Sequence, residues 1–375
     1  MKDEILETCK TNIFRTGFPL EFKISKILED HGWSLIHNRY YIDETQEIER
    51  EIDIIAYKTS ILKPFMLVTS LQLSSKKSET DYWCFLTKKF KKSDPNIDPL
   101  PIHNSTNNKI LNLMFDRYDW KKDFYNEIDS IDFLKEIYRI DKKVFAFQQM
   151  CKKKNTPQND KNIFSSISSL IRSENFEINN LGDRVKDQHI YNFNLISIAD
   201  TEFINFHFIT DEPEVKEIDN IKYLNRHITK IREDFYKVDF IRFSKFDDYL
   251  INYDKLHDWN TKFYLKLYEK YYEKLIEDDE YWYILEDKFF EKIMYLLRME
   301  LKRNSFDSNI QKENVSLYYD KSKKILEIAL RTSDEKGIQF LNKSITIRPT
   351  IENVLAQVYR YKGNFKFCDF PSIPF

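Results

Sequence analysis

A carboxylate and an ammonium group stand in two successive apolar segments near the N-terminus. Asp53 lies in EIDIIAYK (residues 51–58), and Lys76 ends the run MLVTSLQLSSK (residues 66–76). Both segments have the apolar, β-branched composition typical of strands. If the two strands are neighbours in one sheet, Asp53 and Lys76 can meet at the same edge of that sheet.

These two groups suit the hydrolysis of a phosphodiester bond. Such a reaction needs a hard divalent cation held by carboxylate oxygens, which neutralises charge and lowers the pKa of a bound water. It also benefits from a fixed positive group that stabilises the charged oxygens of the transition state. Asp53 suits the first role and Lys76 the second. Glu21, in the preceding segment, could supply a further oxygen ligand, so we expect Asp53 and Glu21 to bind Mg²⁺ or Mn²⁺.

The elements that must position these residues follow from hydrophobic periodicity. Apolar residues between Phe18 and Leu28 recur with a helical period, and Gly32 ends that helix. The later segments alternate between strand-like and helix-like patterns, which predicts a mixed α/β fold. We expect strands at 33–42, 51–58, 64–74 and 237–243, a loop at 88–108, helices at 109–152, 163–173 and 318–331, and a hairpin at 191–209.

Three runs in this order resemble the opening of PD-(D/E)xK enzymes, which have the restriction-endonuclease-like fold. The runs are TGFPLEFKISKILEDHGW, NRYYIDETQEIEREIDIIAY and LQLSSKKSETDYWCFL. In that superfamily a helix carries a Glu, a strand carries the metal-binding Asp, and the next strand carries an acid-x-Lys pair. The resemblance implies these roles for Glu21, Asp53 and Lys76. It extends over roughly residues 10–250, because IFSSISSLIRS resembles the second core helix and NLISIADTEFI the fourth strand.

One position departs from the superfamily pattern. An acidic residue, or sometimes Gln, is expected two residues before the Lys, and Ser74 stands there. A hydroxyl is a poor magnesium ligand and carries no charge. Gln72 shares the strand face of Ser74 and could offer a carbonyl oxygen about 7 Å further along the strand. Alternatively, Glu21 takes over the duty, or the domain keeps the fold and has lost cleavage.

The remaining composition limits the classes of protein. The net charge is -2, the four cysteines are scattered without a CxxC pair, and the N-terminus has no apolar core of a signal peptide. No stretch approaches the ~20 apolar residues that span a bilayer. We therefore expect a cytoplasmic protein that does not associate with membranes.

These observations predict two regions. Residues 1–250 are expected to form the nuclease-like domain, a mixed sheet flanked by helices, with a helical insertion around residues 88–155. Residues 251–375 are expected to be mainly helical. The aromatic helices of this second region are expected either to form a homodimer or to bind a partner protein.

Three hypotheses for function remain open. The first is a Mg²⁺-dependent nuclease that hydrolyses DNA, and the resemblance implies a restriction or antiphage defence effector. The second is a catalytically degenerate subunit that binds nucleic acid or a protein partner in a defence complex. The third is a helical interaction protein whose α/β part is only a scaffold.

Overall fold

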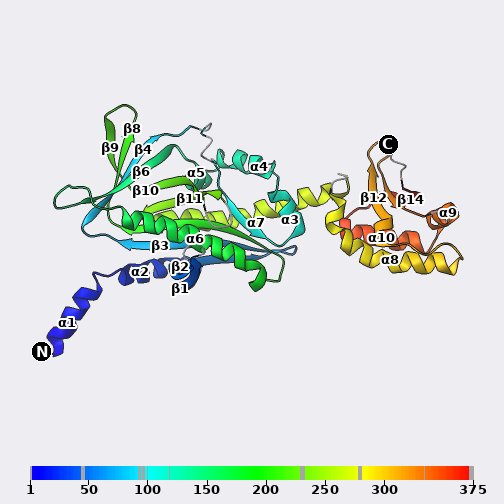
Figure 1. Ribbon diagram of the computed structural model, residues 1–375, viewed down its shortest axis with the longest axis horizontal. Helices are drawn as coiled ribbons and strands as arrows, with labels where there is room; N and C mark the ends of the chain where they lie inside the picture. Colours follow the sequence, from blue (N-terminus) through cyan, green and yellow to red (C-terminus); the bar gives the residue numbers. More distant parts are fainter. Residues whose placement is uncertain are drawn as a thin grey trace. The chain divides into compact units, whose positions relative to one another are not determined.

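The computed structural model describes residues 2–43, 47–91, 94, 98, 100–117, 119–228, 233–277, 281–332 and 334–370. The chain divides into two compact units (Figure 1). Unit 1 comprises Met1–Asn108 and Arg117–Phe263, and unit 2 comprises Lys109–Asp116 and Tyr264–Phe375. No helix in the described part of the chain is long and apolar enough to cross a membrane.

A mixed sheet of seven strands, counted over the described residues, forms the centre of unit 1. Its order is β1-β2-β3-β7-β11-β10, and β5 pairs with β7 beside this path. The pairs β3–β7 and β7–β11 are parallel, and the others are antiparallel. The strands are β1 (Ser34–Asp43), β2 (Ile48–Ile61), β3 (Met66–Lys77), β5 (His103–Thr106), β7 (His189–Asp200), β10 (Asn220–Ile228) and β11 (Glu233–Arg242).

A smaller sheet with the order β6-β4-β8-β9 also belongs to unit 1. Its aromatic residues pack with those of the large sheet: the Trp83 and Phe203 rings stack at 5.7 Å, and Phe85 lies 5.1 Å from Phe240. All four side chains are fully buried, so this aromatic group forms much of the core. The strands are β4 (Asp81–Lys89), β6 (Lys142–Cys151), β8 (Phe203–Phe208) and β9 (Pro213–Ile218), and the short helices nearby are α4 (Asp119–Ile128) and α5 (Asp132–Tyr138).

Helix α6 (Lys161–Arg184) covers one face of the large sheet (Figure 1). Ile163, Ile167 and Leu170 recur at helical spacing and are completely buried in the core, which explains why this segment forms an amphipathic helix. Ser173 of α6 donates a hydrogen bond of 3.0 Å to Gln72 of β3. The even-numbered side chains of β3 therefore point towards α6, because strand side chains alternate between faces.

The opposite face carries α2 (Phe18–Asp30) and the first part of α7 (Phe246–Glu277). His257 of α7 lies 2.9 Å from the Thr69 hydroxyl of β3, and odd-numbered residues of β3 face this side. His31, the C-cap residue of α2, lies 2.6 Å from Asp254 and 3.0 Å from Asp247 of α7. These contacts fix the helix that carries Glu21 against α7.

The Asp254 carboxylate raises the pKa of His31 above its usual 6.5, and Asp247 adds to the effect. A group whose pKa rises on folding stabilises the protein fully below its unfolded pKa and loses that contribution as pH rises through the folded pKa. We therefore expect His31→Gln to lower the free energy of unfolding at pH 6 and to change it much less at pH 9. Urea unfolding at the two pH values measures this difference.

Asp254→Asn provides the matched control, because it removes the principal cause of the raised pKa. The pH dependence of the His31→Gln effect should largely disappear in that background. An equal loss of stability at pH 6 and pH 9 would contradict an ionic contact.

Part of one predicted helical region and the whole of another predicted helix are strands or turns instead. Within the region predicted to be helical at 109–152, residues 142–151 form β6 and pair with β4. Residues 315–330, around the predicted helix 318–331, form a hairpin instead. Asp320 makes its turn by accepting the backbone N–H groups of Ser322 and Lys323, and Lys324 has a positive φ of 53°. Non-local pairing and this turn override the helix propensity of Lys, Gln, Leu and Ala.

Unit 2 contains strands as well as helices. It holds a three-stranded sheet, among its described residues, with the order β12-β13-β14. The boundary between the units falls inside α7, after Phe263. The sequence interpretation placed it at residue 250, because the helical periodicity of α7 is unbroken and gives no sign of a boundary. The elements are α3 (Lys109–Phe115), α8 (Glu286–Arg303), β12 (Val315–Asp320), β13 (Ile325–Leu330), α9 (Glu335–Lys343), α10 (Ile347–Tyr359) and β14 (Asn364–Asp369). The helical insertion expected around residues 88–155 likewise contains β5 and β6 besides its helices.

Candidate active site

The three residues predicted to act together lie at the place where β2 and β3 separate. Pairing between these strands ends at Ile54 and Leu73. Just beyond, the Asp53 carboxylate accepts a hydrogen bond of 2.6 Å from the backbone N–H of Ser75. The Lys76 ammonium lies 3.8 Å from the same carboxylate oxygen. Asp53 and Lys76 therefore lie close together, as strand order and strand alternation predict.

Glu21 completes the group from α2. Its carboxylate accepts a long hydrogen bond of 3.4 Å from the Ser75 hydroxyl. Burial raises the pKa of Glu21, and the negative charges of Asp53 and Glu51 raise it further, against the opposing effects of Ser75 and Lys76. Two carboxylates close enough to repel each other form an arrangement that a cation would relieve.

The residues present suit a Mg²⁺ ion that keeps several of its waters. Across the described residues, no group of three or more His, Cys, Asp or Glu side chains is arranged to hold a metal. Mg²⁺ in phosphate-processing sites is commonly held by one or two carboxylates, and water and substrate phosphate supply its other ligands. Asp53 and Glu21 provide that minimum donor set.

Ser74 occupies the position where the superfamily pattern has an acid. Its hydroxyl lies 3.4 Å from the Asp53 carboxylate, and the residue is 1% exposed. The side chain donates to Asp53 and adds no negative charge. The site therefore lacks the third carboxylate at the position where the pattern predicts it.

Gln72 does not take its place, and the suggestion that it supplies a ligand is wrong. Its carbonyl oxygen accepts from Ser173, and its amide nitrogen donates to Ser70 at 3.4 Å. The residue has no exposed surface, because α6 covers this part of β3. The face that Gln72 shares with Ser74 continues under the helix, so the amide is used inside the core.

The sequence interpretation missed Ser75. Its N–H binds Asp53 and its hydroxyl contacts Glu21, so this one residue joins the strand carboxylate to the helix carboxylate. Alternation along β3 was the available signal, since residue 75 faces the side on which α2 packs. The acid-x-Lys pattern assigns roles to positions 74 and 76 alone, so it gave no role to Ser75.

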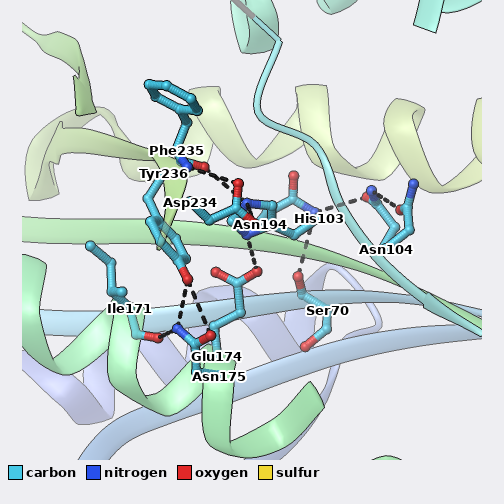
Figure 2. Close-up of polar contacts among 11 residues, drawn as sticks. Ser70, His103, Asn104, Ile171, Glu174, Asn175, Asn194, Asp234, Phe235 and Tyr236 are labelled. Carbon is cyan, nitrogen blue, oxygen red and sulfur yellow. Dashed lines mark hydrogen bonds and ion pairs between the residues drawn. The ribbon is translucent and has the colours of Figure 1, made fainter. Parts of the chain in front are cut away.

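A second polar cluster in unit 1 has the residue types of a catalytic site (Figure 2), and its histidine side chain is 10% exposed. His103 of β5 lies 2.5 Å from Glu174 of α6, and its other ring nitrogen donates to the Phe235 carbonyl at 2.9 Å. Glu174 is 1% exposed, and the adjoining cavity measures only about 10 Å³. Such a space holds about one water. We interpret this cluster as a structural tie between β5, α6 and β11.

The tie requires one proton between His103 and Glu174. A carbonyl can only accept, so the ring nitrogen facing Phe235 carries hydrogen, and the other nitrogen can meet the carboxyl group only if one of the two is protonated. Glu174→Ala removes the partner and should lower the free energy of unfolding by about 3–5 kcal/mol. Chemical denaturation measures this loss. Ser165→Ala, on the exposed side of α6, should change it by less than about 0.5 kcal/mol. Similar values for both variants would show that the tie is unimportant.

Comparison of the chain with protein-family models, curated proteins and solved structures gives no match.

Proposed function

We propose that the chain is a Mg²⁺- or Mn²⁺-dependent nuclease that hydrolyses DNA phosphodiester bonds, with a restriction-endonuclease-like domain in unit 1. One observation carries the proposal: Glu21, Asp53 and Lys76 gather around Ser75 at the diverging ends of β2 and β3. The raised pKa of Glu21 supports it, because the repulsion that contributes to this shift is what a cation would relieve. A role in restriction or antiphage defence follows from the resemblance alone.

Each residue has a chemical task in this proposal. Asp53 and Glu21 would hold the divalent cation, which supplies charge neutralisation and lowers the pKa of a bound water. The Lys76 ammonium stabilises negative charge on the phosphate oxygens and orients the attacking water. Ser75 fixes the Asp53 carboxylate through its N–H, so that the ligand oxygen is positioned before a substrate arrives.

Cleavage of a plasmid in Mg²⁺ or Mn²⁺ tests these tasks. We expect Lys76→Met to lower the cleavage rate roughly 10²–10³-fold, the effect of removing one group that stabilises transition-state charge. Asp53→Asn should reduce the rate at least as much and weaken the dependence on the cation. The neighbouring residue gives a matched control: Lys77 pairs with Glu79 at 2.7 Å, so Lys77→Met should retain cleavage.

Circular dichroism checks that each variant is folded, because an unfolded variant would lose cleavage for an unrelated reason. Cleavage that persists in both Asp53→Asn and Lys76→Met would exclude this site as its source. Loss of cleavage in Lys77→Met to the same extent would point to substrate binding rather than chemistry.

Ser74 favours a second function, a catalytically degenerate domain that binds nucleic acid without cutting it. We expect Ser74→Glu to tighten Mg²⁺ binding, because it adds a carboxylate beside Asp53. Calorimetric titration with Mg²⁺ measures the affinity, and Ser74→Gln is the uncharged control. If plasmid cleavage appears only in Ser74→Glu, the natural chain is the degenerate form. If the natural chain cleaves and Ser74→Glu merely lowers the Mg²⁺ concentration required, it is a working nuclease.

A further inference from the structure

A trough lies on the α6 face of the large sheet, near the C-terminal end of that helix. Its volume is about 330 Å³. This size falls in the range of small-molecule sites, which are concave and mainly apolar with a few polar groups. The lining residues come from β1, β2, β3, β7 and the last turns of α6, all within unit 1.

The strand register explains why the surface is hollow. Tyr57, Ser70 and Phe193 form one cross-strand row, and Thr59, Val68 and Tyr191 form the next. In each row the middle strand carries a smaller residue, Ser70 or Val68, beside an aromatic residue on β7. The small side chains make a floor, and the aromatic rings make walls.

Helix α6 forms the remaining wall. One row further along the sheet, Ser173 closes over Gln72 and leaves no space. Leu181 in the last turn of the helix and Val185 just after its end border the trough with apolar side chains. The hollow is therefore enclosed by apolar groups on the side of the sheet and on the side of the helix.

Two charged side chains, Glu177 and Arg184, belong to the lining of the trough. Glu177 accepts from Arg184 at 2.6 Å and also lies 3.4 Å from Arg39. One carboxylate thus faces two guanidinium groups, of which Arg184 lines the trough and Arg39 lies outside its lining. The Arg184 side chain is about one-third exposed and lines the trough, so it can reach a bound molecule.

We propose that this trough binds a small amphiphilic organic anion, in which a flat apolar body carries one negatively charged group. The apolar body lies on Val68 and Ser70 between the aromatic walls, and the anionic group meets Arg184. An anion complements Arg184, which can share its five donors between Glu177 and a ligand. A neutral molecule of the same shape fits the trough but lacks this contact.

This ligand site is separate from the proposed nuclease site. Ser70 and Ser74 lie on one face of β3, four residues apart, which corresponds to about 13 Å along the strand. Substitutions in the trough therefore leave Asp53 and Lys76 in place. The proposal does not depend on whether the chain cleaves DNA.

Two fluorescent probes of similar shape test the proposal. 8-Anilinonaphthalene-1-sulfonate is an aromatic anion, and N-phenyl-1-naphthylamine is its neutral counterpart. With the full chain, we expect saturable binding of the anionic probe at one site. Arg184→Gln should weaken the anionic probe about fivefold, as one exposed ion pair would, and leave the affinity of the neutral probe unchanged.

Blocking variants on opposite walls locate the site. Thr59 is an exposed strand residue and Val185 is half-buried after α6, so Thr59→Trp and Val185→Trp fill the trough from two sides. Both should abolish binding of both probes, and either one suffices if the other fails to fold. The matched control is Arg226→Gln, because Arg226 is also paired with a glutamate but lies outside the trough. This control should change neither affinity.

Three results would overturn the proposal. Saturable binding of the anionic probe that survives in a folded blocking variant would place it elsewhere. An equal effect of Arg184→Gln on both probes would remove the anionic selectivity. Absence of saturable binding to the natural chain would show that the trough takes no such ligand.

Discussion

The hydrogen bond from the Ser75 N–H to Asp53 is the contact on which the candidate site depends. It forms where the pairing between β2 and β3 ends. Because the main chain of β2 does not pair with Ser75, the Asp53 side chain accepts the Ser75 N–H instead. The bond holds the carboxylate beside Lys76. Glu21 approaches the same residue from α2, and the His31–Asp254 contact anchors that helix to α7. The candidate catalytic side chains therefore lie where β2 and β3 separate.

The two faces of β3 have different structural roles. Residues that face α6 are used for packing, as Gln72 is, until the helix ends and the surface opens into the trough. Residues that face α2 and α7 bind the helices that orient Glu21. Asp53 and Lys76 lie just past the end of the pairing between β2 and β3, and their side chains keep partial access to water while the neighbouring Ser74 is buried.

The sequence predicted the meeting of Glu21, Asp53 and Lys76 because element order and strand alternation are local properties. It misplaced Gln72 because the extent of α6 over β3 is decided by tertiary packing. The strand at residues 142–151 was missed for a related reason: Lys, Gln, Ala and Met favour helices, and only pairing with the distant β4 reverses that preference. Ser75 was missed because the family pattern directs attention to the residues on either side of it.

Ser74 has a physical consequence whichever function is correct. Burial and the charge of Asp53 already raise the pKa of Glu21, so a third carboxylate at position 74 would add to the repulsion in the metal-free protein. The serine instead donates a hydrogen bond to Asp53 and adds no charge. Compared with the acid of the PD-(D/E)xK pattern, Ser74 would also offer a cation one strong ligand fewer. In the proposed nuclease, Ser74 would thus lower the repulsion among the carboxylates and would also weaken metal binding, so that the metal would depend more on substrate phosphate.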